Sequence, residues 1–332
     1  MITGPTFTTF ADAYLAVLED IYHRPVYSTA TRGKTATEAI NASFTIANPV
    51  ARTLYLAARR PNIVFNHAEA LWYLSGRNDL DMIAHYARRL RGLSTDGKSL
   101  TGTAYGPRLF RPTHPDGYSQ FDQILELLRN DPDTKRAAML VMRPDELADP
   151  GNPDVACTLA LQLMLRAGRL HMAAYMRGND AMIGLLGDTF AFTFIQEFTA
   201  RLLGVKVGTY AHHVGSMHIN ILDIPKVESI LAEQTRHLFS HEEMPVGTTW
   251  AHLETVLDWE QRLRINQDTF SPARVDLAPY WQEVIALFEV YRQISHHPDQ
   301  PVTADALTML RPGHRWLVQQ RWPARMPSTV SS

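Results

Sequence analysis

The stretch CTLALQLMLRAGRLHMAAYMRGND, residues 157–180, decides the fold that the sequence predicts. Apolar and polar residues alternate on both sides of Ala167-Gly168, which is typical of two strands joined by a tight turn. A period of two places Tyr175 and Arg177 on one face of the second strand. We therefore expect a β-hairpin here, with a polar face that can form one wall of a pocket.

A long helix and a further polar stretch are expected after this hairpin. Asp188-Thr189 opens the helical run FAFTFIQEFTARLL, which stops at Gly204. An aspartate before an apolar helix is a strong N-cap signal, and the same carboxylate can also face a pocket. The residues able to do chemistry follow one another on these ordered elements: Cys157, Arg177, Asp180, Asp188 and His218.

These residues resemble the thymidylate synthase superfamily. Its members carry a catalytic cysteine on a strand, a hairpin ending in Arg-Ser-x-Asp, a helix that reads the pyrimidine and a later histidine near the sugar. Upstream, HAEALWYLSG with Glu69 corresponds to the family's His-Glu-Leu-Leu-Trp-Phe-Leu-x-Gly, and Tyr105-Gly106 to its Tyr-Gly. The resemblance covers about residues 20–225. Four intervals match those of the family without a gap: Cys157 to Arg177, Arg177 to Asp180, Arg177 to Asp188 and Asp188 to His218.

The resemblance implies an α/β (α+β) fold in which helices flank a large mixed sheet. We expect a single domain over residues 1–332, with a divergent helical part over 226–332 and without the apolar tail that closes over the substrate in the family. Hydrophobic periodicity predicts the remaining elements. Helices are expected at 7–23, 66–75, 121–128, 226–239, 254–264 and 280–296, a buried strand at 137–142, an exposed loop leading into a strand at 27–49, and a loop at 88–103.

The composition is that of an ordinary globular protein. Of the 332 residues, 20% are charged and 45% are apolar, and the formal net charge of −2 argues against electrostatic binding of nucleic acid. No run approaches the ~18 apolar residues of a membrane span, and the N-terminal segment carries acids and lacks a basic region. A single cysteine forms no internal disulfide, so we expect a cytoplasmic protein.

The residues predicted to be catalytic are Cys157, Glu69, Tyr105 and Asp188. A thiolate that adds to C6 of a pyrimidine makes C5 nucleophilic, and Cys157 is the only cysteine available for this step. Arg177 on the neighbouring strand would favour the thiolate and bind phosphate. The resemblance further implies that Glu69 orders water and moves protons at the pyrimidine, and that the hydroxyl of Tyr105 helps to remove the C5 proton.

Three basic residues are predicted to bind the nucleotide phosphate. The resemblance places Arg32 at the position of an arginine that grips the phosphate. Lys135 and Arg136 take the positions of two arginines that reach the phosphate of the partner subunit, which implies an obligate homodimer. Lysine offers a point charge where arginine would bind in a bidentate way. Solvated side chains are the alternative for these residues.

The identity of residue 188 predicts which pyrimidine base the protein binds. Thymidylate synthases carry asparagine at this position, whose amide can donate to O4 and accept from N3–H of uracil. An ionised carboxylate only accepts, so it opposes uracil O4 but can accept from the amino group of cytosine. The same change from Asn to Asp marks the deoxycytidylate hydroxymethylase branch of the superfamily. The resemblance therefore implies a cytidine nucleotide as the substrate.

Further departures from the family predict the sugar and the outcome of the reaction. Gly178 replaces a serine, and Asn220 replaces a tyrosine that binds the 3′-hydroxyl in deoxynucleotide enzymes, which leaves room for a ribose and favours CMP over dCMP. Asp180 matches the aspartate that contacts the pterin of methylenetetrahydrofolate. Arg91 and Ser94 stand where the synthases place shielding tryptophans, which favours addition of water over hydride transfer.

The predicted enzyme is a cytidylate 5-hydroxymethylase, similar to the CMP hydroxymethylases of nucleoside-antibiotic pathways such as that of mildiomycin. It would transfer a one-carbon unit from 5,10-methylenetetrahydrofolate to C5 of CMP. Two alternatives stay open, a dCMP hydroxymethylase and a nucleotide-binding regulator without turnover. No metal is expected, because no other ligand cluster joins His212, His213 and His218.

Overall fold

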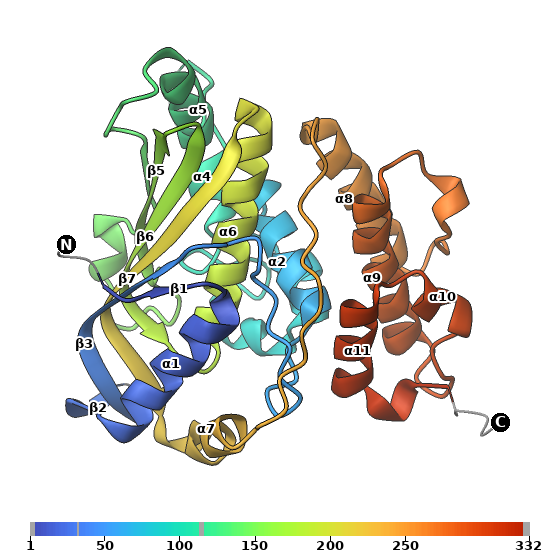
Figure 1. Cartoon of the computed structure of the whole chain (residues 1–332), viewed down its shortest axis with the longest axis horizontal. Coiled ribbons are helices and arrows are strands. Elements are labelled where there is room, and N and C mark those ends of the chain that lie inside the picture. The colour runs from blue at the N-terminus through green and yellow to red at the C-terminus, as the bar shows by residue number, and fades with distance from the viewer. Residues whose placement is uncertain (1–3, 32, 113–115, 328–332) are drawn as a thin grey trace.

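The fold is built around one mixed β-sheet (Figure 1). The computed structural model describes residues 4–31, 33–112 and 116–327. The strands in these ranges are β1 (Thr6–Phe7), β2 (Tyr27–Thr31), β3 (Lys34–Ile46), β4 (Ala138–Leu140), β5 (Thr158–Arg166), β6 (Arg169–Asp180) and β7 (Lys206–Asn220). They pair in the order β1-β3-β7-β6-β5-β4, with β2 on β3 off this path. β1 runs parallel to β3 and β6 parallel to β7, whereas the other neighbours are antiparallel.

Helices cover one face of this sheet. Those of the described residues are α1 (Phe10–His23), α2 (Ile63–Leu74), α3 (Leu80–Tyr86), α4 (Gly106–Phe110), α5 (Gln120–Asn130), α6 (Gly184–Leu203), α7 (Ile224–Leu231), α8 (Trp250–Arg264), α9 (Pro279–His296), α10 (Ala304–Thr308) and α11 (Pro312–Arg321). α1 and α6 pack on the sheet, and α2 packs on α6 (Figure 1). The predicted mixed sheet flanked by helices is confirmed.

The predicted hairpin of residues 157–180 is also confirmed. β5 and β6 pair antiparallel from Thr158↔Met176 to Arg166↔Arg169. Both turn residues adopt positive φ, 49° at Ala167 and 70° at Gly168, as the favoured two-residue hairpin turn requires.

Helix α6 begins at Gly184 and not at Asp188. Its N-cap is Ile183, so Asp188 lies in the second turn and does not cap the helix. The capping interpretation of Asp188 is therefore wrong, because the apolar residues expected to form a loop before it are already helical. The helix is apolar around most of its circumference and buried along most of its length. It ends at Gly204, as predicted, with a left-handed φ of 68°.

Two predictions for the strands need correction. Residues 27–49, predicted as an exposed loop leading into a strand, form the hairpin of β2 and β3, which pair from Tyr27↔Glu38 to Thr31↔Lys34. β3 pairs further with β7 along most of its length, so tertiary pairing overrides its polar composition. The strand predicted as buried at 137–142 is only β4, which lies at the edge of the sheet and leaves Leu140 65% exposed.

The residues beyond β7 form a helical part that packs against α2 and α3. α8 contacts α3, while α9 and α11 contact α2. Between α7 and α8 an extended segment runs alongside the sheet-bearing part and the C-terminal helices (Figure 1). The helix predicted at 226–239 is too long, since α7 ends at Leu231, whereas those predicted at 254–264 and 280–296 lie within α8 and α9. α10 and α11 were not predicted.

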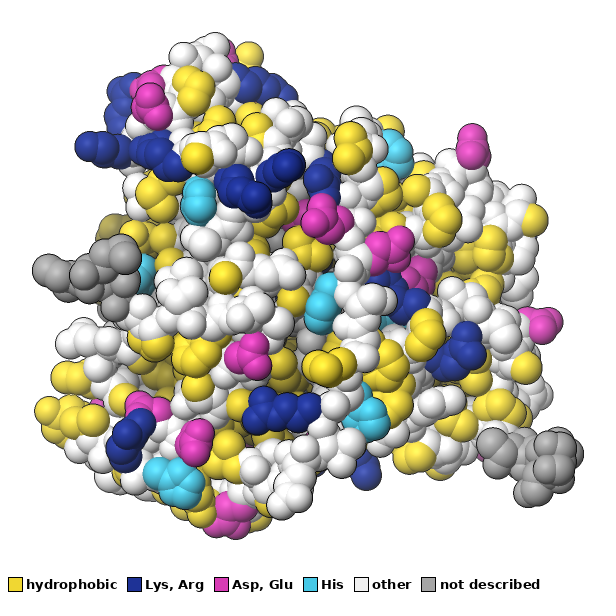
Figure 2. All heavy atoms as spheres, in the orientation of Figure 1, with side chains coloured by type: hydrophobic (Ala, Val, Ile, Leu, Met, Phe, Trp, Pro, Cys, Tyr) yellow, Lys and Arg dark blue, Asp and Glu magenta, His cyan; other side chains and the backbone are white. Residues whose placement is uncertain are grey.

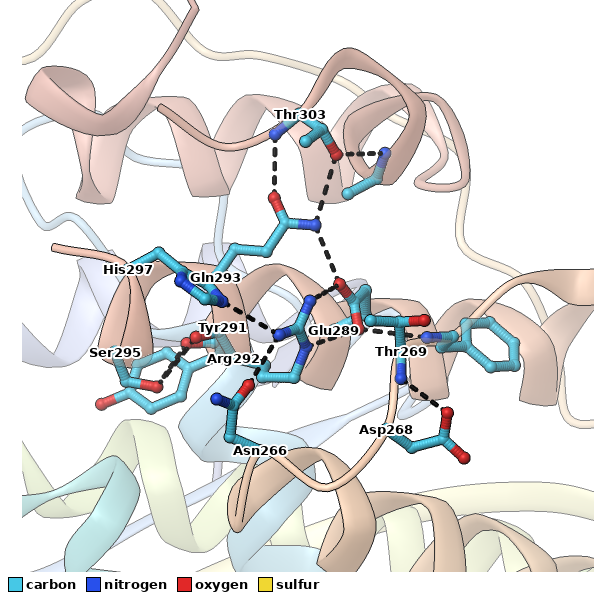
Figure 3. A network of polar contacts seen from close by, with 12 residues as sticks. Asn266, Asp268, Thr269, Glu289, Tyr291, Arg292, Gln293, Ser295, His297 and Thr303 are labelled. Carbon is cyan, nitrogen blue, oxygen red and sulfur yellow. Dashed lines mark hydrogen bonds and ion pairs between the residues drawn. The ribbon is translucent and has the colours of Figure 1, made fainter. Parts of the chain in front are cut away.

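A buried ion pair organises the C-terminal helices (Figure 3). The guanidinium of Arg292 donates to both carboxylate oxygens of Glu289, at 2.7 and 2.9 Å. The same carboxylate accepts from Gln293 at 2.8 Å and from the amide of Phe270 at 3.2 Å, and Arg292 also donates to Asn266 at 2.7 Å. The network attaches the loop after α8 to α9. Its two buried charges pair with each other, so neither is left uncompensated.

The surface carries charges of both signs. On the face shown in Figure 2, basic and acidic side chains are interspersed with hydrophobic and neutral ones, in keeping with the formal net charge of −2. Within the ranges that the structure describes, no helix combines the length and the apolar composition needed to cross a membrane.

Candidate active site

A cavity of about 570 Å³ lies where the start of β5, the end of β6, the first turns of α6 and one face of α2 meet. Most of the residues predicted to act on the substrate line it, although they are widely separated in the sequence. They are Glu69, Tyr105, Cys157, Arg177, Gly178, Asp180, Asp188 and His218. The predicted residues thus bring one thiol, one guanidinium and three carboxyl groups to a single space.

Cys157 lies beside the guanidinium of Arg177. Nη2 of Arg177 is 3.8 Å from Sγ of Cys157. Two backbone carbonyls hold the guanidinium there, since that of Ala156 accepts from Nε at 2.8 Å and that of Val155 accepts from Nη2 at 3.0 Å. The strands are also joined at this point, where the amide of Arg177 donates to the carbonyl of Cys157 at 2.9 Å. A fixed positive charge beside the sulfur stabilises a thiolate, so the pair can supply a nucleophile.

Asp188 lines the cavity from the second turn of α6. Nδ2 of Asn179 donates to Oδ2 of Asp188 at 2.6 Å. Burial raises the pKa of Asp188 to about 7, and the hydrogen bond from Asn179 opposes this shift. Asn179 was not predicted as a site residue, although it lies between two residues that were and lines the same cavity. One oxygen of Asp188 is thus engaged by the protein, and the other can meet a ligand.

Glu69 is buried on α2, close to Asp188. Burial raises the pKa of Glu69 to about 8, and the negative charge of Asp188 adds to this shift. A methyl group on Gly187 would lie 3.0 Å from Oε2 of Glu69, so glycine lets α6 approach this carboxyl group closely. A carboxyl group with a pKa near neutrality can both give and take a proton, which suits the role predicted for Glu69.

Tyr105 stacks on a second tyrosine, Tyr73, that also lines the cavity. Their ring centroids are 5.0 Å apart and the ring planes differ by 20°. Burial raises the pKa of both hydroxyls well above the usual value, so both are neutral at physiological pH. Tyr73 was not predicted as a site residue. It could have been found from its position one helical turn after Glu69, on the same face of α2.

Asp180 lines the cavity and also accepts hydrogen bonds from other residues of the protein. Its Oδ1 accepts from the amides of Met182 at 2.8 Å and Ile183 at 2.9 Å, and its Oδ2 accepts from Nδ2 of Asn220 at 2.7 Å. Both oxygens are therefore engaged, and contact with a pterin stays a prediction. Asn220 is not among the described residues that line the cavity, so its place beside the sugar also stays a prediction.

Lys135 and Arg136 are not brought to the cavity of their own chain. Both are exposed just before β4 and lie outside its lining. Arg91 and Ser94 are outside the lining as well. Arg32 falls outside the residues that the structure describes. Phosphate binding by the three basic residues stays a prediction.

Several arginines that the sequence did not single out line the same cavity, and we call them the arginine wall. Arg321 comes from α11, and its Nη1 donates to the carbonyl of Arg60 at 3.3 Å. Burial and the neighbouring arginines lower the pKa of Arg321. In the described part of the chain, no ion pair with Asp or Glu neutralises any member of the wall, which suits a ligand with several negative charges. Its members are Arg59, Arg60, Arg88, Arg89 and Arg321.

Two of the three histidines considered for a metal site, His212 and His213, contact aromatic side chains of the protein. The hydroxyl of Tyr210 lies 2.7 Å from Nδ1 of the buried His212, and His213 stacks on Tyr175 with ring centroids 5.1 Å apart. Over residues 4–31, 33–112 and 116–327, no group of three or more His, Cys, Asp or Glu side chains could hold a metal ion.

Known proteins resemble this chain over most of its length. The thymidylate synthase family profile matches residues 12–248. The deoxyuridylate hydroxymethyltransferase of Bacillus phage SP01 is 34% identical over 307 residues, which covers 85% of this chain and 78% of the phage protein. The deoxyuridylate hydroxymethyltransferase of Pseudomonas phage M6 is 31% identical over 172 residues, which covers 51% of this chain and 48% of that protein.

A solved structure shares the fold. Thermostable thymidylate synthase A from Bacillus subtilis superposes with a TM-score of 0.58 and 20% identity, over 72% of this chain and 87% of the other. The chain belongs to the thymidylate synthase family and is a one-carbon transferase.

Proposed function

We propose that this enzyme is a cytidylate 5-hydroxymethyltransferase. It transfers the one-carbon unit of methylenetetrahydrofolate to C5 of CMP and completes the reaction with water. The observation that carries this proposal is the carboxyl group of Asp188, which lines the same cavity as Cys157 and is held by Asn179. The names of the two phage relatives, both hydroxymethyltransferases, support water as the final nucleophile.

The thiolate of Cys157 starts the reaction. Its electron pair forms a bond to C6 of the pyrimidine, the 5,6-double bond opens, and C5 becomes nucleophilic. Arg177, whose Nη2 lies 3.8 Å from the sulfur, stabilises the thiolate before the attack. Methylenetetrahydrofolate supplies the one-carbon unit that C5 takes up. C5 then loses its proton to the carboxylate of Glu69, and the hydroxyl of Tyr105, which lines the same cavity, assists this step.

Loss of the C5 proton is coupled to cleavage of the bond between the one-carbon unit and the folate nitrogen. Tetrahydrofolate leaves with a proton from Glu69, whose carboxylate is thereby restored, and an exocyclic methylene group stays on the ring. Water adds to this carbon, and its proton passes to the carboxylate of Glu69, which lines the cavity. The electron pair displaced onto the ring expels the thiolate of Cys157 from C6 and restores the 5,6-double bond. The products are 5-hydroxymethyl-CMP and tetrahydrofolate, and the cysteine is regenerated.

The protonation state of Asp188 governs the choice of base. An ionised carboxylate only accepts, so it matches the amino group of cytosine and opposes O4 of uracil. A neutral carboxyl group both donates and accepts, so it can pair with either base. Because the pKa of Asp188 is raised to about 7, both forms are present near neutrality. The preference for cytosine should therefore increase as the solution becomes more alkaline.

We expect the ratio of kcat/KM for CMP to that for UMP to rise about 10-fold between about pH 6 and pH 8, because two opposed acceptors cost about 1–3 kcal/mol. Below the pKa of about 7, protonated Asp188 can donate to O4 of uracil, and above it this donor is lost. Steady-state kinetics with both nucleotides measure the ratio. The Asp188→Asn variant has no ionisable group at this position, so its ratio of kcat/KM values should not change with pH. A flat profile for the unaltered enzyme would contradict this account.

Deoxyuridylate is the second candidate substrate, because the phage relatives are named for it. Uracil would need the neutral form of Asp188. For the sugar, Gly178 supports ribose, since a methyl group built on it would meet only the carbonyl oxygen of Ser216, at 3.7 Å, and this side of the cavity is open. We therefore propose CMP ahead of dCMP. A regulator without turnover is the remaining alternative.

Incubation with methylenetetrahydrofolate and each of CMP, dCMP, UMP and dUMP, followed by mass spectrometry, tests the proposal. We expect 5-hydroxymethyl-CMP as the main product. A methylated uridylate with dihydrofolate would overturn the hydroxymethylation, and preferred hydroxymethylation of dUMP would overturn the choice of cytosine. Exchange of the C5 hydrogen of CMP that depends on Cys157 would exclude the regulator.

We further propose that two subunits form the active enzyme. Lys135 and Arg136 are exposed and lie away from the cavity of their own chain, so they are free to meet a nucleotide on a partner. By strand register, Leu140 and Tyr175 share one face of the sheet, and they are 65% and 37% exposed. This face lies opposite α6, and its exposed hydrophobic side chains suit association with a second copy.

Arg321→Ala should weaken folate binding more than it slows turnover. The carboxylates of a folate match the arginine wall, whose members form no ion pair with Asp or Glu among the described residues. Loss of one charged hydrogen bond of about 1–2 kcal/mol should raise KM for methylenetetrahydrofolate roughly 5–30-fold, with kcat changed less than about 2-fold. Arg262→Ala, which removes a surface arginine paired with Asp258, is the matched control. An equal KM in both variants would show that the wall does not contact the folate.

A further inference from the structure

One face of α2 presents a row of polar side chains to the cavity. Asn62, Asn66, Glu69 and Tyr73 are three or four residues apart, so they lie along one side of the helix, and all of them line the cavity. Oδ1 of Asn62 caps the helix by accepting from the amide of Phe65 at 3.1 Å. Oδ1 of Asn66 is buried and has no hydrogen-bond partner in the described part of the chain. The row therefore contains a buried polar atom, Oδ1 of Asn66, that the described part of the protein does not satisfy.

The hydroxyl of Tyr73 is a second polar group of this row that lines the cavity. The side chain is 2% exposed, and none of the residues that the structure describes forms a hydrogen bond with its hydroxyl. Stacking on Tyr105, at 5.0 Å between ring centroids, holds the ring in place. Because Tyr73 lines the cavity and the protein does not occupy its hydroxyl, a water molecule or a ligand in the cavity can bind this group.

Packing does not explain why this residue is a tyrosine. Burial and the stacking on Tyr105 require only the ring, which phenylalanine also has. The hydroxyl lies one helical turn after Glu69 on the same face, so a water bound to it is within reach of the Glu69 carboxylate.

We propose that Tyr73 positions the water that adds to the one-carbon unit, and so directs the reaction to the hydroxymethylated product. This inference rests on the function proposed above. The hydroxyl of Tyr73 accepts one hydrogen of the water, and the carboxylate of Glu69 accepts the other. The lone pair of the water oxygen then forms the bond to the exocyclic methylene carbon, and Glu69 takes the proton. The displaced electron pair expels the thiolate of Cys157, so the step consumes one water and needs no oxidant or reductant.

Tyr73→Phe separates this role from packing, because it removes only the hydroxyl. Release of tritium from C5 of labelled CMP reports the steps before the water, and formation of 5-hydroxymethyl-CMP reports the water step. We expect tritium release to stay within about 3-fold of the unaltered enzyme, while product formation falls about 10- to 100-fold, as for loss of a positioned hydrogen bond. An added small thiol should then be captured at the methylene carbon in place of water.

The ratio of tritium release to product is the decisive readout. Tyr291→Phe removes a hydroxyl that donates to the carbonyl of His85 at 2.9 Å, away from the cavity lining, and should leave the ratio unchanged. An unchanged ratio in Tyr73→Phe, whether both rates fall together or neither falls, would overturn the inference. Absence of a hydroxymethylated product from the unaltered enzyme would instead overturn the proposed function.

Discussion

Cys157→Ala should abolish turnover, with a loss of at least about 10⁴-fold in kcat, as expected when the sole nucleophile of a covalent mechanism is removed. The chain has no other cysteine that could take over. Both the exchange of the C5 hydrogen and the formation of 5-hydroxymethyl-CMP should disappear, because both follow the addition at C6. Nucleotide binding should persist, since Arg177 is anchored by the carbonyls of Val155 and Ala156 and stays in place.

Tritium release from labelled CMP measures the exchange, and isothermal titration calorimetry measures the binding. Cys157→Ser is the matched control for size and should be nearly as inactive, because a serine hydroxyl is not ionised near neutral pH. If the C5 hydrogen still exchanges in Cys157→Ala, another group must attack the ring. The proposed mechanism, in which Cys157 adds to C6, would then be wrong.

Asp188→Asn should reverse the choice of base, with the ratio of kcat/KM for CMP to that for UMP falling about 10²- to 10³-fold. The amide that this substitution introduces can donate to O4 and accept from N3–H of uracil. Cytosine would leave polar groups of this site unpaired, and a site with unpaired polar groups rejects a substrate by large factors. The fold should survive, because the asparagine keeps an oxygen that can accept from Asn179, as Asp188 does at 2.6 Å.

Steady-state kinetics with the four nucleotides CMP, dCMP, UMP and dUMP separate base preference from sugar preference. Asp223→Asn, at a carboxylate outside the cavity lining, is the control for loss of a negative charge. Unchanged base selectivity in Asp188→Asn would show that this residue does not read the base. Helix capping could not then explain its presence, because α6 begins at Gly184.

The sequence by itself determined the parts of the site that depend on short intervals. The hairpin of residues 157–180 follows from strict alternation around Ala167-Gly168, and it brings Arg177 to within 3.8 Å of the sulfur of Cys157. Strand pairing has a period of two, so the register of a tight hairpin leaves little freedom. The helix that carries Glu69 was predicted for the same kind of reason, from local periodicity and a terminal glycine.

Only the tertiary structure decided the contacts that depend on packing between distant elements. Arg321 reaches the cavity because α11 packs on α2, and no local pattern relates it to the site. The contact between Asn179 and Asp188 exists because α6 starts at Gly184, which turns Asp188 from a predicted cap into a buried acid with a pKa of about 7. Burial and hydrogen bonding set such a pKa, and both arise only when helices and strands pack together.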